Sequence, residues 1–289
     1  MAELKTYNGY ALWLYLPNVP AAVVFAILFA LGTTAITCKC LEPRHGIAQF
    51  LSLVGSVLET AGFIARATAR DKTDELIPHV IQSVFILVAP ALFAASVYMT
   101  LGRIIRSIQA QPLSIIRVRL LTKLFVMGDV LSFALQSGGA SMMATSDDPK
   151  MGENMIIAGL LVQIVVFGIY VVTSVIFHYR VRTQRPNVYA NFGNNWEKLL
   201  VMLYIISALI MVRSVFRVVE YVGGQDGYLL KHEWTLYVFD ALLMFATVVI
   251  FAWRFPGPVW LKSMDIEFAL EGQRPSESPP RKRLLQCRR

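Results

Sequence analysis

The sequence is poor in charge, cysteine and histidine. Only 16% of its 289 residues are Asp, Glu, Lys or Arg, against about 25% in ordinary soluble domains. The four histidines are scattered and do not have the spacing of metal ligands. The chain also lacks an H-E-x-x-H helix, a G-x-S-x-G elbow and a Walker loop. These absences argue against an enzyme, and we expect neither a metal nor a cofactor.

Long apolar runs take the place of the missing charge. A run of about 20 apolar residues spans the hydrocarbon core of a bilayer as a helix, because only a helix satisfies its own backbone amides there. Seven such runs predict an all-α integral membrane protein with seven transmembrane helices in one bundle. They cover 17–37, 47–66, 77–101, 121–143, 155–177, 199–221 and 234–254.

The basic residues predict the orientation of these helices. Of the 27 lysines and arginines, 19 lie in the tail and in the connections on its side of the membrane. An excess of basic residues marks the cytoplasmic face, so the N-terminus is expected outside and the C-terminus inside. The net charge of +8 is thereby explained by topology, and no nucleic-acid partner is expected. The predicted segments are an extracellular N-terminus (1–16), a transmembrane domain (17–260) and a disordered basic cytoplasmic tail (261–289).

The cysteines and the tail leave two questions open. Cys38 and Cys40 follow the first helix on the predicted cytoplasmic side, where no structural disulfide is expected. They are either acylated or free thiols without a role. The basic cluster at 281–283 either contacts anionic lipid of the inner leaflet or is simply solvated.

The sixth apolar run contains charges that lipid does not tolerate. In "IMVRSVFRVVEYVGG" (210–224), Arg213, Arg217 and Glu220 fall on one face of a helix. A charge at the bilayer centre costs at least about 2.5–3.5 kcal/mol. This face must therefore point into the bundle, where acidic partners are needed.

Acceptors at the same depth occur on other helices. Glu59 and Arg66 lie in the outer half of the second helix, and Tyr237 and Asp240 in the outer third of the seventh. Arg213 or Arg217 is expected to pair with Asp240 or Glu59. The remaining polar residues expected in this layer are Gln82, Gln136, Gln163 and Glu233.

Two features lie outside this layer. Asp129, in the inner half of the fourth helix, is a candidate gate or proton site. Pro90 cannot donate to the carbonyl of Ile86 and is expected to kink the third helix.

The layer of polar residues itself has two interpretations, an ion-pair network that fixes helix register or a polar cavity that receives a ligand head group.

Several segments together resemble the fungal lipid-translocating exporters, the family named for resistance to aminocholesterol. They are "ETAGFIAR" (59–66), "QSVFILVAPALFAASVYMTLGRII" (82–105), "FVMGDVLSFALQSGG" (125–139), "GLLVQIVVF" (159–167) and "IMVRSVFRVVEYVGGQDGYLLKHEWTLYVFDALLM" (210–244). Gly62-Phe63 departs from the Gly-Tyr that is usual in the family. The resemblance implies a seven-helix plasma-membrane protein linked to outward movement of amphipathic lipids such as sphingoid bases and to resistance to toxic amphiphiles. It supplies no catalytic residues.

Two functions remain open from the sequence. In the first, the protein transports an amphipathic lipid, sphingoid-base-like or sterol-like, and Glu59, Glu220 or Asp240 accepts the ammonium group of a sphingoid base. In the second, it is a heptahelical receptor or sensor that acts through its basic cytoplasmic connections. The absence of nucleotide-binding motifs implies that transport would run downhill or couple to another gradient.

Overall fold

The computed structural model describes residues 18–40, 47–69, 76–145, 149–184, 195–223 and 232–254. Within these ranges there are seven helical segments long and apolar enough to cross a membrane, as the sequence predicts. The first four are α1 (Val19–Cys40), α2 (Ile47–Thr68), α3 (Leu76–Ser107) and α4 (Val118–Thr145). They are followed by α5 (Pro149–Gln184) and α7 (Asn195–Val222). The seventh span consists of α9 (Glu233–Leu236), the π-helical turn η3 (Tyr237–Ala241) and α10 (Leu242–Arg254).

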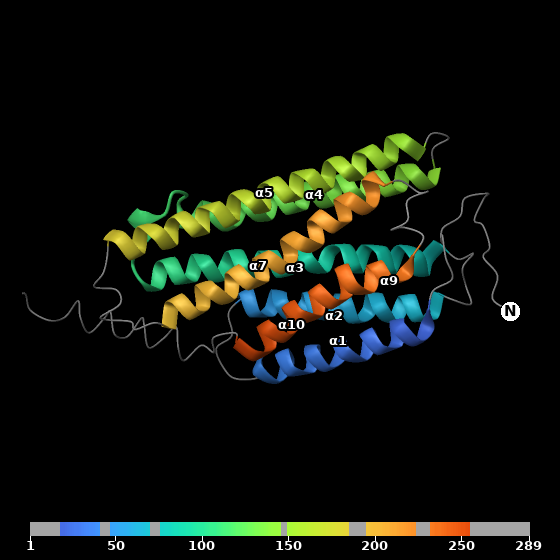
Figure 1. Ribbon diagram of the computed structural model, residues 1–289, viewed down its shortest axis with the longest axis horizontal. Helices are drawn as coiled ribbons and strands as arrows, with labels where there is room; N and C mark the ends of the chain where they lie inside the picture. Colours follow the sequence, from blue (N-terminus) through green and yellow to red (C-terminus); the bar gives the residue numbers. More distant parts are fainter. Residues whose placement is uncertain are drawn as a thin grey trace, which may run out of the picture.

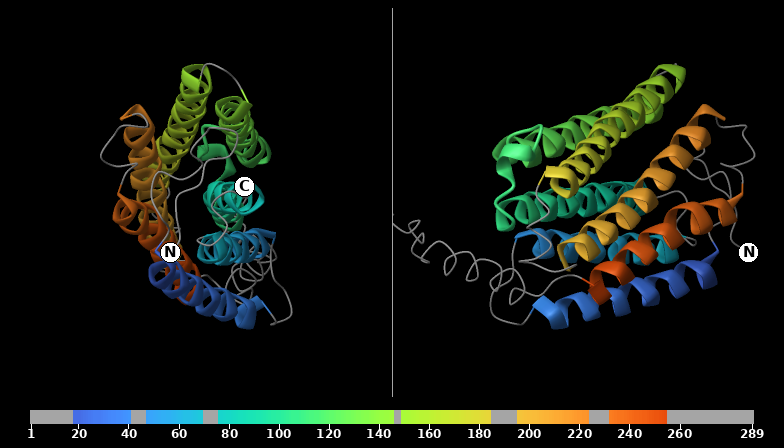
Figure 2. Two further views of the ribbon diagram at one scale, coloured as in Figure 1. Left: turned by 90° about the vertical axis from the view of Figure 1, so that its right-hand side faces the viewer. Right: turned by 60° about the vertical axis from the view of Figure 1, so that its left-hand side comes forward.

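The helices pack as antiparallel neighbours and form one bundle (Figure 1). The strongest contacts join α2 to α3, α4 to α5 and α1 to α2. Viewed end-on, α4 and α5 lie at one side of the bundle and α1 at the opposite side (Figure 2, left). Contacts of α10 with α1 and α7, and of α7 with α3 and α5, complete the arrangement. We call the end where α1 terminates the inner end, following the predicted orientation.

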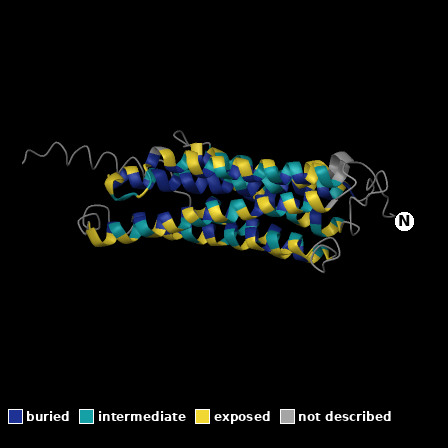
Figure 3. Ribbon diagram, turned by 90° about the horizontal axis from the view of Figure 1, so that it is seen from above, coloured by how far each residue is buried: buried dark blue, intermediate teal, exposed yellow. Residues whose placement is uncertain are grey.

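Side-chain burial follows the membrane environment. Exposed valines, leucines and isoleucines cover the outward faces of the helices, whereas buried residues lie between them (Figure 3). Close helix approach depends on small residues at a few points. A Cβ atom at Gly152 of α5 would lie 2.6 Å from the carbonyl oxygen of Gly139 in α4. Side chains other than hydrogen therefore do not fit at this crossing.

Aromatic rings fill the space between α1, α2 and the seventh span. Phe29 and Phe63 stack with centroids 5.3 Å apart, and Phe25 and Tyr237 stack at the same centroid distance. At the inner end, the Lys39 ammonium donates to the Trp253 carbonyl at 3.1 Å and joins α1 to α10. These contacts hold the seventh span against the first two helices and so fix the position of η3.

Several helices are longer than the apolar runs that predict them. The fifth run covers 155–177, whereas α5 extends from Pro149 to Gln184, and α3 continues to Ser107. Hydropathy marks only the part of a helix that lies in hydrocarbon, and polar flanks continue the same hydrogen-bond ladder. α3 passes through Pro90 as one helix, and the expected kink stays a prediction. The predicted N-terminal segment 1–16, the boundary at 260 and the tail 261–289 lie outside the described residues.

Candidate functional site

A buried arginine joins three spans at the centre of the site. Arg213 of α7 is only 3% exposed, and its Nε donates to Oδ1 of Asp240 in η3. Its Nη2 donates to the backbone carbonyl oxygen of Ile86 in α3 at 2.9 Å. That carbonyl is available because Pro90, four residues later, has no N–H with which to close the helical bond. One guanidinium thus satisfies both a carboxylate and the acceptor freed by a proline.

The aspartate in this pair lies in a π-helical turn. The segment YVFDA (237–241) departs from α-helical geometry, and both Tyr237 and Asp240 are buried there. A π turn inserts a residue into a helix and changes how the two halves face their neighbours, and such turns occur frequently at functional sites. The carboxylate that anchors Arg213 is therefore carried by irregular backbone.

Glu59 of α2 completes the charged centre without an ion pair. It is 1% exposed, and neither of its carboxylate oxygens has a hydrogen-bond partner among the described residues. It lies within electrostatic range of Arg213, Arg217 and Asp240. A buried carboxyl group without partners is costly unless a proton, a water molecule or a ligand satisfies it. Glu59 is therefore the carboxyl group of this centre with both oxygens unsatisfied among the described residues.

Arg217 has a partner on its own helix. Its Nη1 donates to Oε2 of Glu220 at 2.8 Å. Residues three apart on a helix are already neighbours, so this pair requires no alignment between helices. One of the two arginines is expected from the sequence to pair with Asp240 or Glu59, and Arg213 does so, with Asp240. Arg217 still lies within electrostatic range of Asp240. We call Glu59, Arg213, Arg217, Glu220 and Asp240 the central charge cluster; if all five were ionised, its net charge would be −1.

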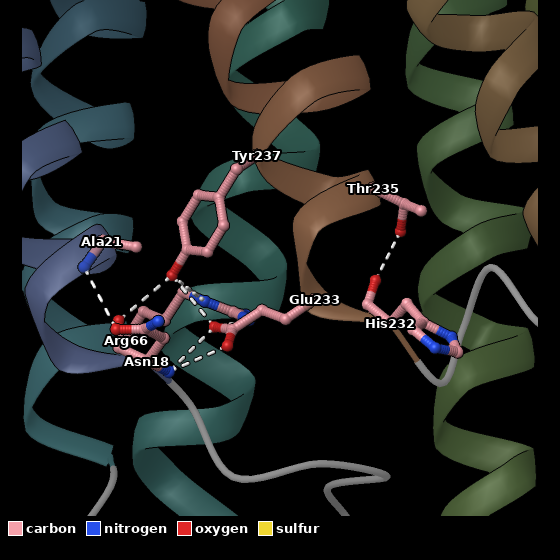
Figure 4. Close-up of polar contacts among 7 residues, drawn as sticks. All are labelled: Asn18, Ala21, Arg66, His232, Glu233, Thr235 and Tyr237. Atoms are coloured by element: carbon pink, nitrogen blue, oxygen red, sulfur yellow. Dashed lines mark hydrogen bonds and ion pairs between the residues drawn. The ribbon is translucent and has the colours of Figure 1, made fainter.

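A second cluster, which we call the outer clamp, closes the outer end of the bundle (Figure 4). Arg66 of α2 donates through Nη2 to Oε1 of Glu233 at 2.7 Å and through Nε to the Tyr237 hydroxyl at 3.2 Å. The Tyr237 hydroxyl donates to the same Glu233 oxygen at 2.9 Å. Glu233 also accepts from the backbone N–H of Asn18 at 2.9 and 3.0 Å. The outer clamp thereby ties the starts of α1 and α9 to the end of α2.

The glutamines predicted in the same layer do not all join these clusters. Gln136 of α4 donates through Nε2 to Gln163 of α5 at 3.2 Å and to the Ser132 hydroxyl at 2.7 Å. Gln82 is buried in α3, and its Oε1 has no hydrogen-bond partner within the described part of the chain. Asp129 of α4 is likewise buried, beside Tyr98 of α3. The structure therefore divides the predicted single layer into a central cluster, an outer clamp and an α4–α5 amide pair.

Sequence reasoning missed two partners in these clusters. The Asn18 N–H and the Ile86 carbonyl are backbone groups, which side-chain patterns do not reveal. Pro90 gave a signal for the second, because it predicts a free carbonyl four residues earlier. Nothing in the sequence indicated that Arg213 would reach it. Among the described residues, no group of three or more His, Cys, Asp or Glu side chains is placed to hold a metal ion.

Seven membrane-length helices around buried, ionisable side chains define the class of the protein. It is an integral, multi-pass membrane protein with a charged centre inside its bundle. The family model described as RTA1 like protein matches residues 52–263, and the chain belongs to this family.

Three proteins of Saccharomyces cerevisiae are similar to this chain over most of its length. Protein RTM1 of Saccharomyces cerevisiae is 42% identical over 214 residues, which cover 74% of this chain and 69% of the relative. Protoporphyrin uptake protein 1 of the same species is 32% identical and covers 86% of this chain and 92% of its own length. The sphingoid long-chain base transporter RSB1 of S. cerevisiae is 22% identical and covers 83% and 72%. No solved structure matches the chain significantly.

Proposed function

We propose that the protein transports amphipathic lipids with a cationic head group, such as sphingoid bases, across the plasma membrane. The names of its relatives support a role in lipid transport, since one is a sphingoid long-chain base transporter. On this proposal the head group enters a polar cavity in the outer half of the bundle, and export confers resistance to toxic amphiphiles.

The observation that carries the proposal is the unpaired carboxyl group of Glu59. Two arginines and two acids of the central charge cluster already form the pairs Arg213–Asp240 and Arg217–Glu220. Glu59 is the fifth group and has no hydrogen-bond partner among the described residues. An ammonium group placed there would neutralise the cluster and supply up to three donors to the carboxylate.

The surroundings of Glu59 suit an amphipathic ligand. The exposed faces of the helices are apolar, so the hydrocarbon tail of such a lipid can remain in the bilayer at little cost in free energy while its head group enters the bundle. Arg213 would hold Asp240 in place and prevent it from competing for the ammonium. Because the sequence has no nucleotide-binding motif, we propose that movement follows the lipid gradient or a coupled ion.

Flux in liposomes tests the proposal. Purified protein is reconstituted, and transbilayer movement of a fluorescent sphingoid base is compared with that of a fluorescent neutral acylglycerol. Glu59→Gln should lower movement of the base far more than that of the neutral lipid. Glu153→Gln in α5, which alters a carboxylate outside the cluster, serves as the control.

Two outcomes would overturn the transport proposal. Equal loss of both fluxes in Glu59→Gln would remove the ammonium-binding role of this residue. Saturable binding of the base with no flux in the unaltered protein would instead identify the alternative function, a heptahelical receptor or sensor of amphipathic ligands.

A further inference from the structure

A series of protonatable side chains leads from the inner end of the bundle toward its middle. It is separate from the central charge cluster. It begins at His178 of α5, whose Nε2 lies 3.4 Å from Oε1 of Glu197 at the start of α7. Both side chains are about one quarter exposed. The other ring nitrogen, Nδ1, lies 3.3 Å from the Tyr204 hydroxyl. The imidazole therefore links a partly exposed carboxylate to a hydroxyl that lies further inside the bundle.

Hydroxyl groups continue this series of protonatable side chains beyond His178. The Tyr204 hydroxyl donates to the backbone carbonyl of Ser174 at 3.2 Å, and the Ser174 side chain lies beside the hydroxyls of Tyr204 and Tyr170. Ser174 and Tyr170 are each 1% exposed. Neither hydroxyl has a hydrogen-bond partner that meets normal geometry in the described residues. Buried hydroxyls without partners are positions where ordered water is expected.

The series of protonatable side chains ends at Asp129. The ring of Tyr170 packs against that of Tyr98 in α3, with centroids 4.6 Å apart, and Tyr98 lies beside the Asp129 carboxyl group. Both carboxyl oxygens and the Tyr98 hydroxyl lack a partner with hydrogen-bonding geometry among the described residues. The five orphaned oxygens of Ser174, Tyr170, Tyr98 and Asp129 thus form one buried polar group.

The positions of these residues along their helices agree with one continuous route. At 1.5 Å per residue, Tyr170 lies about 21 Å from the inner end of α5, and Asp129 lies about 17 Å from the inner end of α4. His178 lies roughly 9 Å from the inner end of α5 on the same measure. The route therefore runs from the inner end to the middle of the bundle.

The chemistry of the route suits protons better than a ligand or a structural ion pair. The titratable groups that face Asp129 are Tyr98 of α3 and, through its ring contact, Tyr170 of α5, and neither supplies a cation to pair with a carboxylate. At His178 the facing groups are Glu197 and Tyr204, with the ring of Trp196 at 5.7 Å. Every member can both accept and release a proton, whereas the neighbouring rings of Phe125 and Phe167 leave little room for a larger solute.

We propose that this series of side chains, from His178 to Asp129, conducts protons between the inner surface and Asp129. A proton from the inner surface enters at Nε2 of His178 as Nδ1–H passes to the Tyr204 hydroxyl, which turns from the Ser174 carbonyl and releases its own proton to the Ser174 hydroxyl. Tyr170, Tyr98 and water between them repeat the exchange until a proton reaches a carboxyl oxygen of Asp129. Each hydroxyl is regenerated, so one proton moves and nothing else is consumed. The use of this proton to drive lipid movement rests on the proposed function, but the route itself does not.

Infrared spectroscopy tests the route without any lipid substrate. A protonated Asp129 gives a carboxylic-acid stretching band that is absent in Asp129→Asn and shifted in Asp129→Glu. After transfer of the full-length protein to deuterated buffer, the band shifts as the proton exchanges. Tyr204→Phe and Ser174→Ala should slow this exchange by about tenfold or more, because the lost oxygen interrupts the relay.

Tyr179→Phe is the matched control, since Tyr179 follows His178 directly but is 70% exposed. It should exchange at the rate of the unaltered protein. The proposal is overturned if no band depends on Asp129. It is also overturned if the folded Tyr204→Phe and Ser174→Ala variants exchange as fast as the control, which would make the cluster merely structural. Failure of lipid flux alone would refute the proposed function and leave this result standing.

Discussion

Replacement of Asp240 by asparagine removes one charge from a deeply buried ion pair. The two side chains of the Arg213–Asp240 pair are 4% and 2% exposed. Loss of one partner from a buried pair costs about 3–5 kcal/mol, since the other charge is left uncompensated. Arg213 would keep the Ile86 carbonyl, and Glu59 would be the acid left to receive it. We therefore expect a smaller loss from Asp240→Asn than complete isolation of Arg213 would cause.

A double-mutant cycle measures this rescue. Glu59→Gln alone should change the unfolding free energy by only about 1 kcal/mol, because the loss of its attraction to the arginines offsets removal of a buried, unpaired carboxyl group. In the Asp240→Asn background the same change should cost about 1–3 kcal/mol, since Arg213 then has no acid within reach.

Thermal unfolding in detergent is the assay. At about 2–4 °C per kcal/mol, complete isolation of Arg213 would lower the melting temperature by roughly 6–20 °C, so Asp240→Asn should lower it by less than this, and the double variant should fall further than the sum of the single changes. Glu153→Gln, a carboxylate of α5 outside the cluster, should leave the melting temperature unchanged. Additivity of the two changes within about 0.5 kcal/mol would show that Glu59 and Asp240 do not share Arg213.

Three further changes test other parts of the structure. Pro90→Ala restores an N–H that competes with Arg213 for the Ile86 carbonyl. Lipid flux should therefore fall, while the free energy of unfolding changes by only about 1 kcal/mol. Unchanged flux would show that the bond between Arg213 and this carbonyl does not contribute to transport. Arg66→Lys cannot keep both contacts of the outer clamp and should cost about 1–3 kcal/mol in thermal unfolding, whereas an unaltered melting temperature would show the clamp to be dispensable. Gly152→Ala should destabilise by about 1–3 kcal/mol because α4 and α5 must separate. Gly168→Ala, whose Cβ meets nothing within 4 Å, should be neutral or stabilising, and equal effects would refute the tight crossing.

The membrane spans and the inward-facing charges could be predicted because each follows from the cost of exposing polar groups to lipid. All seven apolar runs are helices, and Arg213 and Glu220 are buried as their shared helix face requires. Pro20 lies in the first turn of α1, where a missing N–H is harmless.

Other features depend on alignment between helices, which one-dimensional patterns do not contain. Depth alone placed Glu59 and Asp240 at the same level, but it did not decide which of them Arg213 contacts. The π turn at 237–241 has no sequence signal in YVFDA, and the sequence did not decide whether Arg213 or Arg217 would make the expected pair with Asp240. The series of protonatable side chains from His178 to Asp129 was also missed, because only Asp129 stood out as a charge among hydroxyls spread over three helices.

The outer clamp and the central charge cluster differ in how far their carboxylate oxygens are hydrogen-bonded. Every oxygen of Glu233 in the outer clamp accepts a hydrogen bond, so the clamp is complete without a ligand. In the central charge cluster, Glu59 and one oxygen of Asp240 accept none within the described residues. The carboxylate of the outer clamp therefore needs no ligand to satisfy it, whereas the central charge cluster retains unfilled acceptors among the described residues in the interior of the bundle.

Photo-crosslinking with a sphingoid base tests the central claim most directly. The base carries a photoreactive group next to its ammonium, and the labelled peptides of the reconstituted protein are mapped by mass spectrometry. We predict adducts on the buried faces of α2 and α7 close to Glu59 and Arg213, lost in Glu59→Gln but retained in Glu153→Gln. Adducts confined to the exposed, lipid-facing side chains, with the same yield in both variants, would contradict the account.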